Sequence, residues 1–199
     1  MKKKSILLLL LLLITGCTVV RINTSSIDNI INVILSKEGK LYNRVGRGYK
    51  YYVPRGVTYI DTSGSNDKLY SNGVYYYLYL DEVSYYYKNV EKFKENSSKY
   101  YSKKIENKDK KGYLEITKKG NFYLIEFVYN YAKIETLVKE KDITSAVLNS
   151  SYILSTIKYN KNIVKLSLED NYLKNKEETY EKYSHKNVSE DSFLKYEEK

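Results

Sequence analysis

The chain has 199 residues, of which 42% are hydrophobic, and a formal net charge of +10 at pH 7. The hydrophobic share is close to that of ordinary globular proteins, so the composition excludes a wholly disordered chain. The single cysteine excludes a framework of internal disulfides.

The chain opens with the pattern of a secretory signal peptide. Three lysines at positions 2–4 precede an apolar run at positions 6–14, which contains seven consecutive leucines. A helix that spans a membrane needs about 20 apolar residues. Because this run is much shorter, we expect a cleaved export signal and not a permanent span.

A lipid-attachment motif closes the apolar run. Positions 14–17 (Ile-Thr-Gly-Cys) resemble the lipobox of bacterial lipoproteins, in which a peptidase cuts before the cysteine. The resemblance implies a signal peptide at 1–16, a diacylglycerol with acyl chains such as palmitate on the Cys17 thiol, and a lipidated tether at 17–25. Two buried acyl chains suffice for stable attachment. The alternatives are an ordinary signal peptide that contains a cysteine and a short uncleaved anchor.

The expected location determines the expected partners. A lipoprotein of this kind lies on the extracytoplasmic face of the cell membrane, so the membrane is its first partner through the lipid anchor. Without residues 1–16, which hold three lysines and no acid, the chain keeps 183 residues and a net charge of +7. That charge favours an anionic lipid or an anionic wall polymer as a further partner. The location excludes nucleic acid.

Sequence periodicity predicts a single α+β domain over residues 26–168. Apolar residues spaced like one helix face predict a helix at 26–38 and a second helix from Asp142 to about residue 157. Asn72 and Gly73 form the dipeptide preferred in two-residue hairpin turns. Alternation and turn residues predict strands at 48–53, 57–61, 68–71, 74–80, 83–87, 113–117, 122–129 and 132–138. We therefore expect an antiparallel sheet with an N-terminal helix and another helix packed on one face.

The C-terminal part is more polar. We expect a short extended segment at 163–168 and a polar, helical or loose tail at 169–199. Within the tail, residues 171–183 have the composition of a polar helix.

One segment carries a family resemblance. Residues 48–54 (Gly-Tyr-Lys-Tyr-Tyr-Val-Pro) look like the opening strand of PsbP-like and DcrB-like domains, which run aromatic–x–aromatic into a proline. The order of the predicted elements up to residue 160 is similar too, and DcrB-like proteins are themselves envelope lipoproteins. That family often has a tryptophan after the proline, whereas this chain has none. The resemblance implies a PsbP-like fold and an accessory or binding role, with no catalytic residues to transfer.

The sequence offers little for catalysis. The only histidine, His185, lies in the charged C-terminal stretch, and the sequence contains no nucleophile elbow, phosphate-binding loop or zinc-ligand pattern. We therefore expect no cofactor, no metal and no catalytic set. One alternative stays open: a two-residue turn at 130–131 places Glu126 opposite Glu135, as an acid pair for glycan hydrolysis or as two side chains on a wet sheet face.

Three tyrosines suggest ligand binding. Tyr75, Tyr77 and Tyr79 point to one side of a predicted strand. If that side is exposed, it presents a row of amphipathic rings suited to a sugar or a peptide. The alternative is strand propensity combined with a codon bias toward tyrosine.

Three arginines give a second set of candidate ligand-binding residues. Arg44, Arg47 and Arg55 bracket the first predicted strand in a chain that otherwise favours lysine. Arginine recognises carboxylates and phosphates with fixed geometry. The alternative, which the composition favours, is that these residues lie on a solvated surface. The sequence thus predicts a non-enzymatic binding or accessory protein of the cell envelope, with a surface glycan hydrolase as the alternative.

Overall fold

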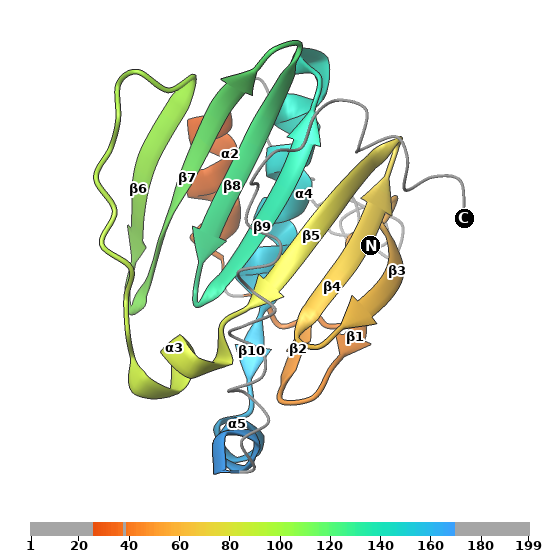
Figure 1. Ribbon diagram of the computed structural model, residues 1–199, viewed down its shortest axis with the longest axis vertical. Coiled ribbons are helices and arrows are strands. Elements are labelled where there is room, and N and C mark those ends of the chain that lie inside the picture. Colours follow the sequence, from red (N-terminus) through yellow and green to blue (C-terminus); the bar gives the residue numbers. More distant parts are fainter. Residues whose placement is uncertain (1–25, 38, 170–199) are drawn as a thin grey trace, which may run out of the picture.

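The computed structural model describes residues 26–37 and 39–169 and shows an α+β fold (Figure 1). This confirms the predicted class, an antiparallel sheet with an N-terminal helix and another helix on one face. The signal peptide, Cys17 with its tether, and the C-terminal tail with His185 and the predicted helix at 171–183 lie outside the described residues.

A seven-stranded antiparallel sheet forms the body of the molecule. Its strand order is β3-β4-β5-β9-β8-β7-β6, so that two meanders, β3–β5 and β6–β9, join where β5 pairs with β9. The strands are β3 (Thr58–Ser63), β4 (Asn66–Ser71), β5 (Val74–Leu80), β6 (Tyr101–Asn107), β7 (Lys110–Lys119), β8 (Phe122–Tyr129) and β9 (Ala132–Val138).

Two tight turns fix the register of the sheet. Between β4 and β5, Asn72 and Gly73 have φ values of 49° and 80°, as the predicted type I′ turn requires. Between β8 and β9, Asn130 and Tyr131 have φ values of 53° and 60°. Both turns therefore contain two residues, and the pairing predicted across each of them is present.

Two helices cover one face of this sheet, behind it in Figure 1. α2 (Ile27–Leu35) starts after Ser26, whose hydroxyl accepts a hydrogen bond from Asn29 N. α4 (Ile143–Thr156) follows a 3-10 turn, η1 (Glu140–Asp142), and contacts α2, β8 and β9. The core between helices and sheet includes Ile31, Ile34, Phe127, Ile134, Val147 and Leu154. None of the described helices is long and apolar enough to cross a membrane.

A smaller sheet and two more helices gather at one end of the molecule. The small sheet has the order β1-β2-β10 and contains β1 (Arg44–Val45), β2 (Tyr49–Tyr51) and β10 (Lys158–Tyr159). α5 (Lys161–Glu169) follows β10 and contacts α3 (Glu82–Tyr87), which follows β5. We call this end, with α3, β10 and α5, the α5 end; α5 lies at the bottom of Figure 1.

Three segments differ from the prediction. Residues 83–87, predicted as a strand, lie in α3, whose first turn is capped by Asp81 Oδ1 accepting from Ser84 N at 2.8 Å. Residues 163–168, predicted as extended, form most of α5. The lysine-rich residues 101–107, for which the sequence predicts no element, form the edge strand β6.

The described chain begins and ends at opposite ends of the domain. Asp28, in the first turn of α2, accepts a hydrogen bond from Tyr101 at the start of β6. Leu35, the last residue of α2, accepts one from Asn107 at the end of β6. α2 therefore runs along β6 toward the α5 end, and Ser26 lies at the opposite end.

Candidate binding site

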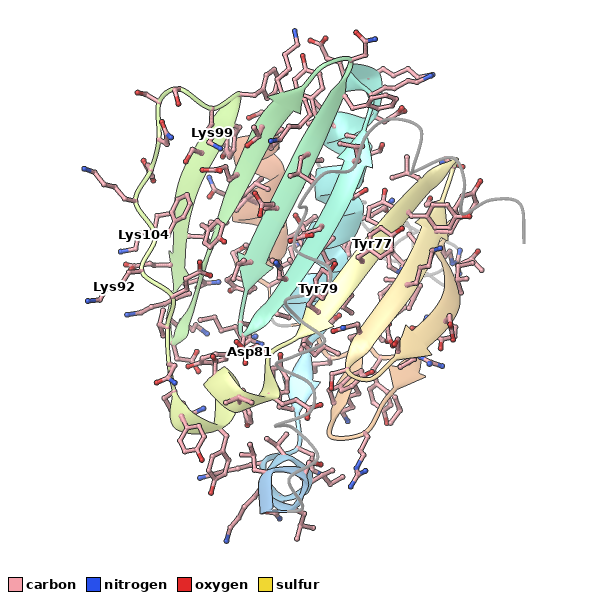
Figure 2. All side chains as sticks on the ribbon, viewed as in Figure 1. Tyr77, Tyr79, Asp81, Lys92, Lys99 and Lys104 are labelled. Atoms are coloured by element: carbon pink, nitrogen blue, oxygen red, sulfur yellow. The ribbon has the colours of Figure 1, made fainter. Side chains whose placement is uncertain are left out.

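The face of the large sheet that α2 and α4 leave uncovered, here called the open face, carries the aromatic and charged side chains of the central strands. Tyr75, Tyr77 and Tyr79 alternate with Tyr76, which is part of the core. Figure 2 shows Tyr77 and Tyr79 on the front of the sheet. Strand pairing continues the row of Tyr77 across five strands as Lys68, Tyr77, Glu135, Glu126 and Glu115.

The two glutamates predicted to face each other do so. Glu126 of β8 pairs with Glu135 of β9, and on its other side with Glu115 of β7. Lysines form ion pairs with the two outer glutamates of this row. Lys133 Nζ lies 2.5 Å from Glu135 Oε1, and Lys99 Nζ lies 2.9 Å from Glu115 Oε1. Glu135 is only 4% exposed, so its ion pair is largely shielded from water. Without these ammonium groups, three neighbouring carboxylates would repel one another.

A pocket of about 340 Å³ opens beside this row. α3 and the loop after it supply one side, and β7, β8 and β9 supply the other. The polar and aromatic side chains that line it are Asp81 (labelled in Figure 2), Ser84, Asn89, Glu91, Asp109, Lys111, Tyr113, Glu126, Tyr131 and Lys133. The pocket thus combines two phenol rings with four carboxylates and two ammonium groups. Glu126 lines it, whereas Glu135 does not.

The two tyrosines of the pocket are neutral hydrogen-bonding groups. Burial and the nearby carboxylates, first Glu91 and then Glu126, raise the pKa of Tyr113 well above its ordinary value. Burial also raises the pKa of Tyr131. The ring of Phe93 stacks on Tyr113 with 4.0 Å between centroids, which holds that wall in place. Both phenols therefore offer a donor, an acceptor and a ring face at neutral pH.

The predicted tyrosine row lies on the open face but is only partly accessible. Tyr75 and Tyr77 are half-buried, and Tyr79 is 4% exposed. Lys68 Nζ lies 4.1 Å from the ring centroid of Tyr75, and Lys133 Nζ lies 5.0 Å from that of Tyr79. Tyr77 and Tyr79 line a small pocket of about 100 Å³. Lys133, which contacts the Tyr79 ring, lines the larger pocket and so connects the tyrosine row to it.

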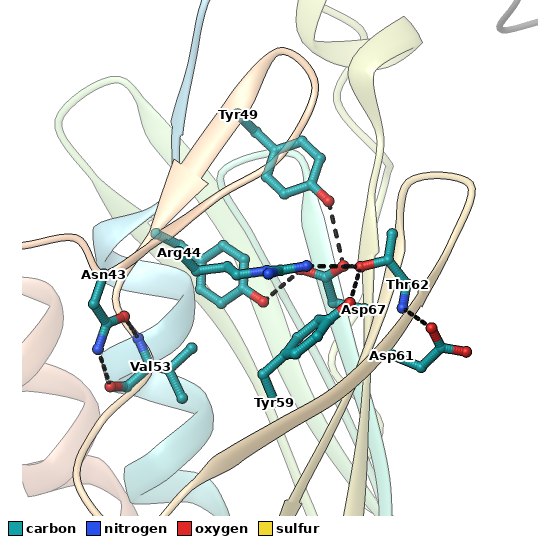
Figure 3. A network of polar contacts seen from close by, with 9 residues as sticks. Asn43, Arg44, Tyr49, Val53, Tyr59, Asp61, Thr62 and Asp67 are labelled. Carbon is teal, nitrogen blue, oxygen red and sulfur yellow. Dashed lines mark hydrogen bonds and ion pairs between the residues drawn. The ribbon is translucent and has the colours of Figure 1, made fainter.

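The three candidate arginines do not meet in one site. Arg44 is held inside a polar network: its guanidinium carbon lies 3.5 Å from the ring centroid of Tyr59, and its Nη2 donates to Thr62 Oγ1 at 3.1 Å (Figure 3). Arg47 and Arg55 are exposed, and they lie in the turns before and after β2. These contacts of Arg44 stabilise the fold. The recognition of a carboxylate or phosphate by the three arginines stays a prediction.

Comparison with known proteins assigns this chain to no family. No family model, curated protein or solved structure matches this chain. The similarity of residues 48–54 to PsbP-like and DcrB-like domains therefore stays an interpretation of that segment. Function has to be inferred from the geometry of the site.

Sequence reasoning missed most of the pocket. Its residues come from α3, the β6–β7 turn and three strands, and only the pairing of β7, β8 and β9 brings them together. One sequence signal could have revealed α3, which forms one side of the pocket. Asp81 followed by Glu82 is a common start of a helix. Within residues 26–37 and 39–169, no three His, Cys, Asp or Glu side chains are grouped as metal ligands would be.

Proposed function

We propose that this chain is a lipid-anchored protein of the cell envelope that binds a glycan on the open face of its sheet without changing it chemically. Lipid on Cys17 holds the protein on the extracytoplasmic side of the membrane. The motif at positions 14–17 supports the location. The pocket beside Tyr113 and Glu126 is the observation that carries the binding function.

The chemistry of the pocket suits a sugar. The rings of Tyr113 and Tyr131 can pack against the C–H faces of a sugar ring, while Asp81 and Glu126 accept hydrogen bonds from its hydroxyls. The volume of about 340 Å³ lies at the lower end for small-ligand sites. A peptide is less well served, because recognition of an extended peptide uses the backbone of a strand edge, and this pocket lies on a sheet face.

Mass spectrometry of the native N-terminus tests the location. We expect a mature chain that begins at Cys17 and carries a diacylglycerol on its sulfur. The Cys17→Ala variant should keep residues 1–16 and leave the membrane fraction. A native product that is full-length, soluble and free of acyl groups contradicts this part of the proposal.

A glycan array with the native protein, followed by calorimetry on the retained glycan, tests the binding function. Glu126→Gln should weaken binding about tenfold, since it removes a charged hydrogen-bond acceptor from the pocket. Glu106→Gln is the matched control, because the Glu106 side chain is 52% exposed and lies on the edge strand β6. Equal effects of the two substitutions, or no retained glycan, would count against a glycan site here.

One observation favours the hydrolase alternative, namely that Glu126 and Glu135 face each other. A glycosidase of this type needs both carboxylates beside the same bond. Here Glu135 is ion-paired with Lys133 and does not line the pocket, so the geometry supports binding better than hydrolysis. Incubation with the retained glycan tests this. New reducing ends that disappear in both Glu126→Gln and Glu135→Gln would favour the hydrolase.

A further inference from the structure

A third hollow, a groove of about 500 Å³, lies at the α5 end. It runs between the β1–β2 turn and the junction of β10 with α5. These segments are held together because Asn160 N donates to Gly48 O at 2.8 Å. Gly48 has a φ of 86°, and a Cβ there would lie 3.3 Å from Val164 Cγ2. Glycine therefore permits the close approach that forms the groove.

The charge of this groove is positive. Lys50, Lys158 and Lys161, here called the groove lysines, line it, and no Asp or Glu is among the described residues that do so. The acid that lies beneath Gly48 is Glu82, which is buried and accepts a hydrogen bond from Ser65 at 3.0 Å. Concave sites lined by one sign of charge concentrate ligands of the opposite sign.

Stacked tyrosine rings join the groove to α3. The ring of Tyr159, which lines the groove, stacks on Tyr85 with 4.3 Å between centroids. Lys88 Nζ lies 4.3 Å from the same Tyr85 ring. α3 therefore meets the groove through an aromatic contact, and Lys88 follows α3 as its C-cap residue.

The rim of the groove is apolar. Val45 is 64% exposed and Ile163 is 38% exposed, and both line the groove beside the lysines. A ligand that fits must therefore offer separated negative charges with carbon atoms between them. A compact inorganic anion offers negative charge at a single point and no carbon atoms to contact the apolar rim.

We propose that this groove binds a polyol phosphate polymer of the cell envelope. The groove lysines contact successive phosphates, and Val45 and Ile163 contact the carbon chain that joins them. The inference rests on the proposed extracytoplasmic location, where such a polymer is accessible, and it is independent of the glycan pocket on the open face.

Lipid headgroups carry the same phosphate chemistry, but the placement of the groove favours the polymer. Ser26, the first described residue after the lipidated Cys17 and its tether, lies at the end opposite α5. The fourteen residues of α4 alone separate the two ends by about 21 Å. The attachment point at Ser26 and the groove therefore lie at opposite ends of the domain, which favours a ligand outside the membrane that holds the anchor.

The test uses the native lipidated protein in nanodiscs of phosphatidylcholine, titrated with poly(glycerol phosphate). One variant combines Lys50→Gln, Lys158→Gln and Lys161→Gln. The control variant changes three exposed lysines at the opposite end to glutamine, namely Lys118, Lys119 and Lys139. We expect the groove variant to bind the polymer at least about tenfold more weakly, and the control to change by less than about twofold. Equal thermal midpoints of unfolding show that both variants keep the fold.

Three outcomes would overturn the proposal. The first is that the native protein does not bind the polymer, and the second is that both variants lose the same affinity for it. The third is displacement of the polymer when phosphatidylglycerol replaces phosphatidylcholine, because it shows that the groove binds headgroups. Recovery of the protein in the nanodisc reports on the lipid anchor alone. A failure of the anchor is thereby distinguished from a failure of the groove.

Discussion

Tyr51 of the small sheet donates its hydroxyl to Asp67 of the large sheet, with 2.5 Å between the phenol oxygen and Oδ2. Tyr49 and Thr62 donate to Oδ1 of the same carboxylate at 3.3 and 2.5 Å, and Arg44 Nε lies 3.9 Å from Oδ2. Figure 3 shows the side chains of Arg44, Tyr49 and Thr62 converging on Asp67. Because Asp67 is 1% exposed, its charge is compensated by protein groups instead of water. This network links β2 to β4.

Removal of the central carboxylate should loosen the junction of the two sheets. We expect Asp67→Ala to lower the free energy of unfolding by about 3 kcal/mol, because it leaves the donors of two tyrosines and the charge of Arg44 without their acceptor. Asp61→Ala is the control, since Asp61 is exposed and accepts only from the neighbouring Thr62 N, and it should change stability by about 0.5 kcal/mol or less. Chemical denaturation of both variants measures the difference. Similar values for the two would show that the network does not stabilise the junction.

The buried tyrosines predict a specific response to alkali. Burial, followed by the charge of Asp67, raises the pKa of Tyr49 and Tyr51, and burial likewise raises that of Tyr101 and Tyr113. A phenol whose pKa is higher in the folded state stabilises the fold fully below its unfolded pKa of about 10, and this contribution is lost as the pH rises further.

Phenolate absorbance and circular dichroism, followed together as the pH is raised, check this response. We expect a first phase of tyrosine ionisation with the fold intact and a second phase that coincides with unfolding. Tyr51→Phe should remove one tyrosine from the second phase only. Complete ionisation of all tyrosines before any loss of the fold would refute the expectation.

The ion pair on the open face should contribute to stability. Glu135→Ala leaves Lys133 in a partly buried position without its carboxylate, and we expect the free energy of unfolding to fall by about 2 kcal/mol. Glu106→Ala breaks a comparable contact, 2.9 Å from Lys104, between side chains that are more than half exposed. That change should leave the free energy of unfolding almost unchanged, because water screens an exposed ion pair. Denaturant titration of both variants gives the comparison, and a larger effect at Glu106 would be inconsistent with it.

The β4–β5 turn allows a test of backbone conformation alone. Gly73 has a φ of 80°, and a Cβ added there meets no atom within 4 Å, so a substitution is resisted by the backbone and not by crowding. We expect Gly73→Ala to destabilise the fold by about 1 kcal/mol, Gly73→Asn by less and Gly73→Val by more, since asparagine tolerates and β-branched residues disfavour positive φ. Thermal unfolding ranks the three variants. Any other order would mean that the turn adopts another type.

Elements whose partners are close in the sequence were the predictable ones. The expected bounds of β8 and β9 coincide with those observed, because alternating apolar residues flank a two-residue turn and the register follows from it. The predicted face of α4 is buried for the same kind of reason, since its apolar spacing fits a helix and no other element.

Elements that depend on distant contacts were not predictable. The tyrosines of α3 fit a strand or a helix equally well, and the helix is favoured by the Asp81 cap and by the stacking of Tyr85 on Tyr159. Asp67 lies between the predicted strands at 57–61 and 68–71, whereas in the structure it belongs to β4. It is buried because β1, β2 and β3 each contribute a partner to it. No local pattern at Arg44 distinguishes such a partner from a ligand-binding residue.

The opposed positions of Ser26 and α5 have a mechanical consequence. If the protein is attached as proposed, to a membrane at one end and to a polymer at the other, it is stretched along the direction in which α2, α4 and the long strands run (Figure 1). Such a force would enter the domain through α2 and leave it through the small sheet or α5, so it would load the packing of α2 against α4.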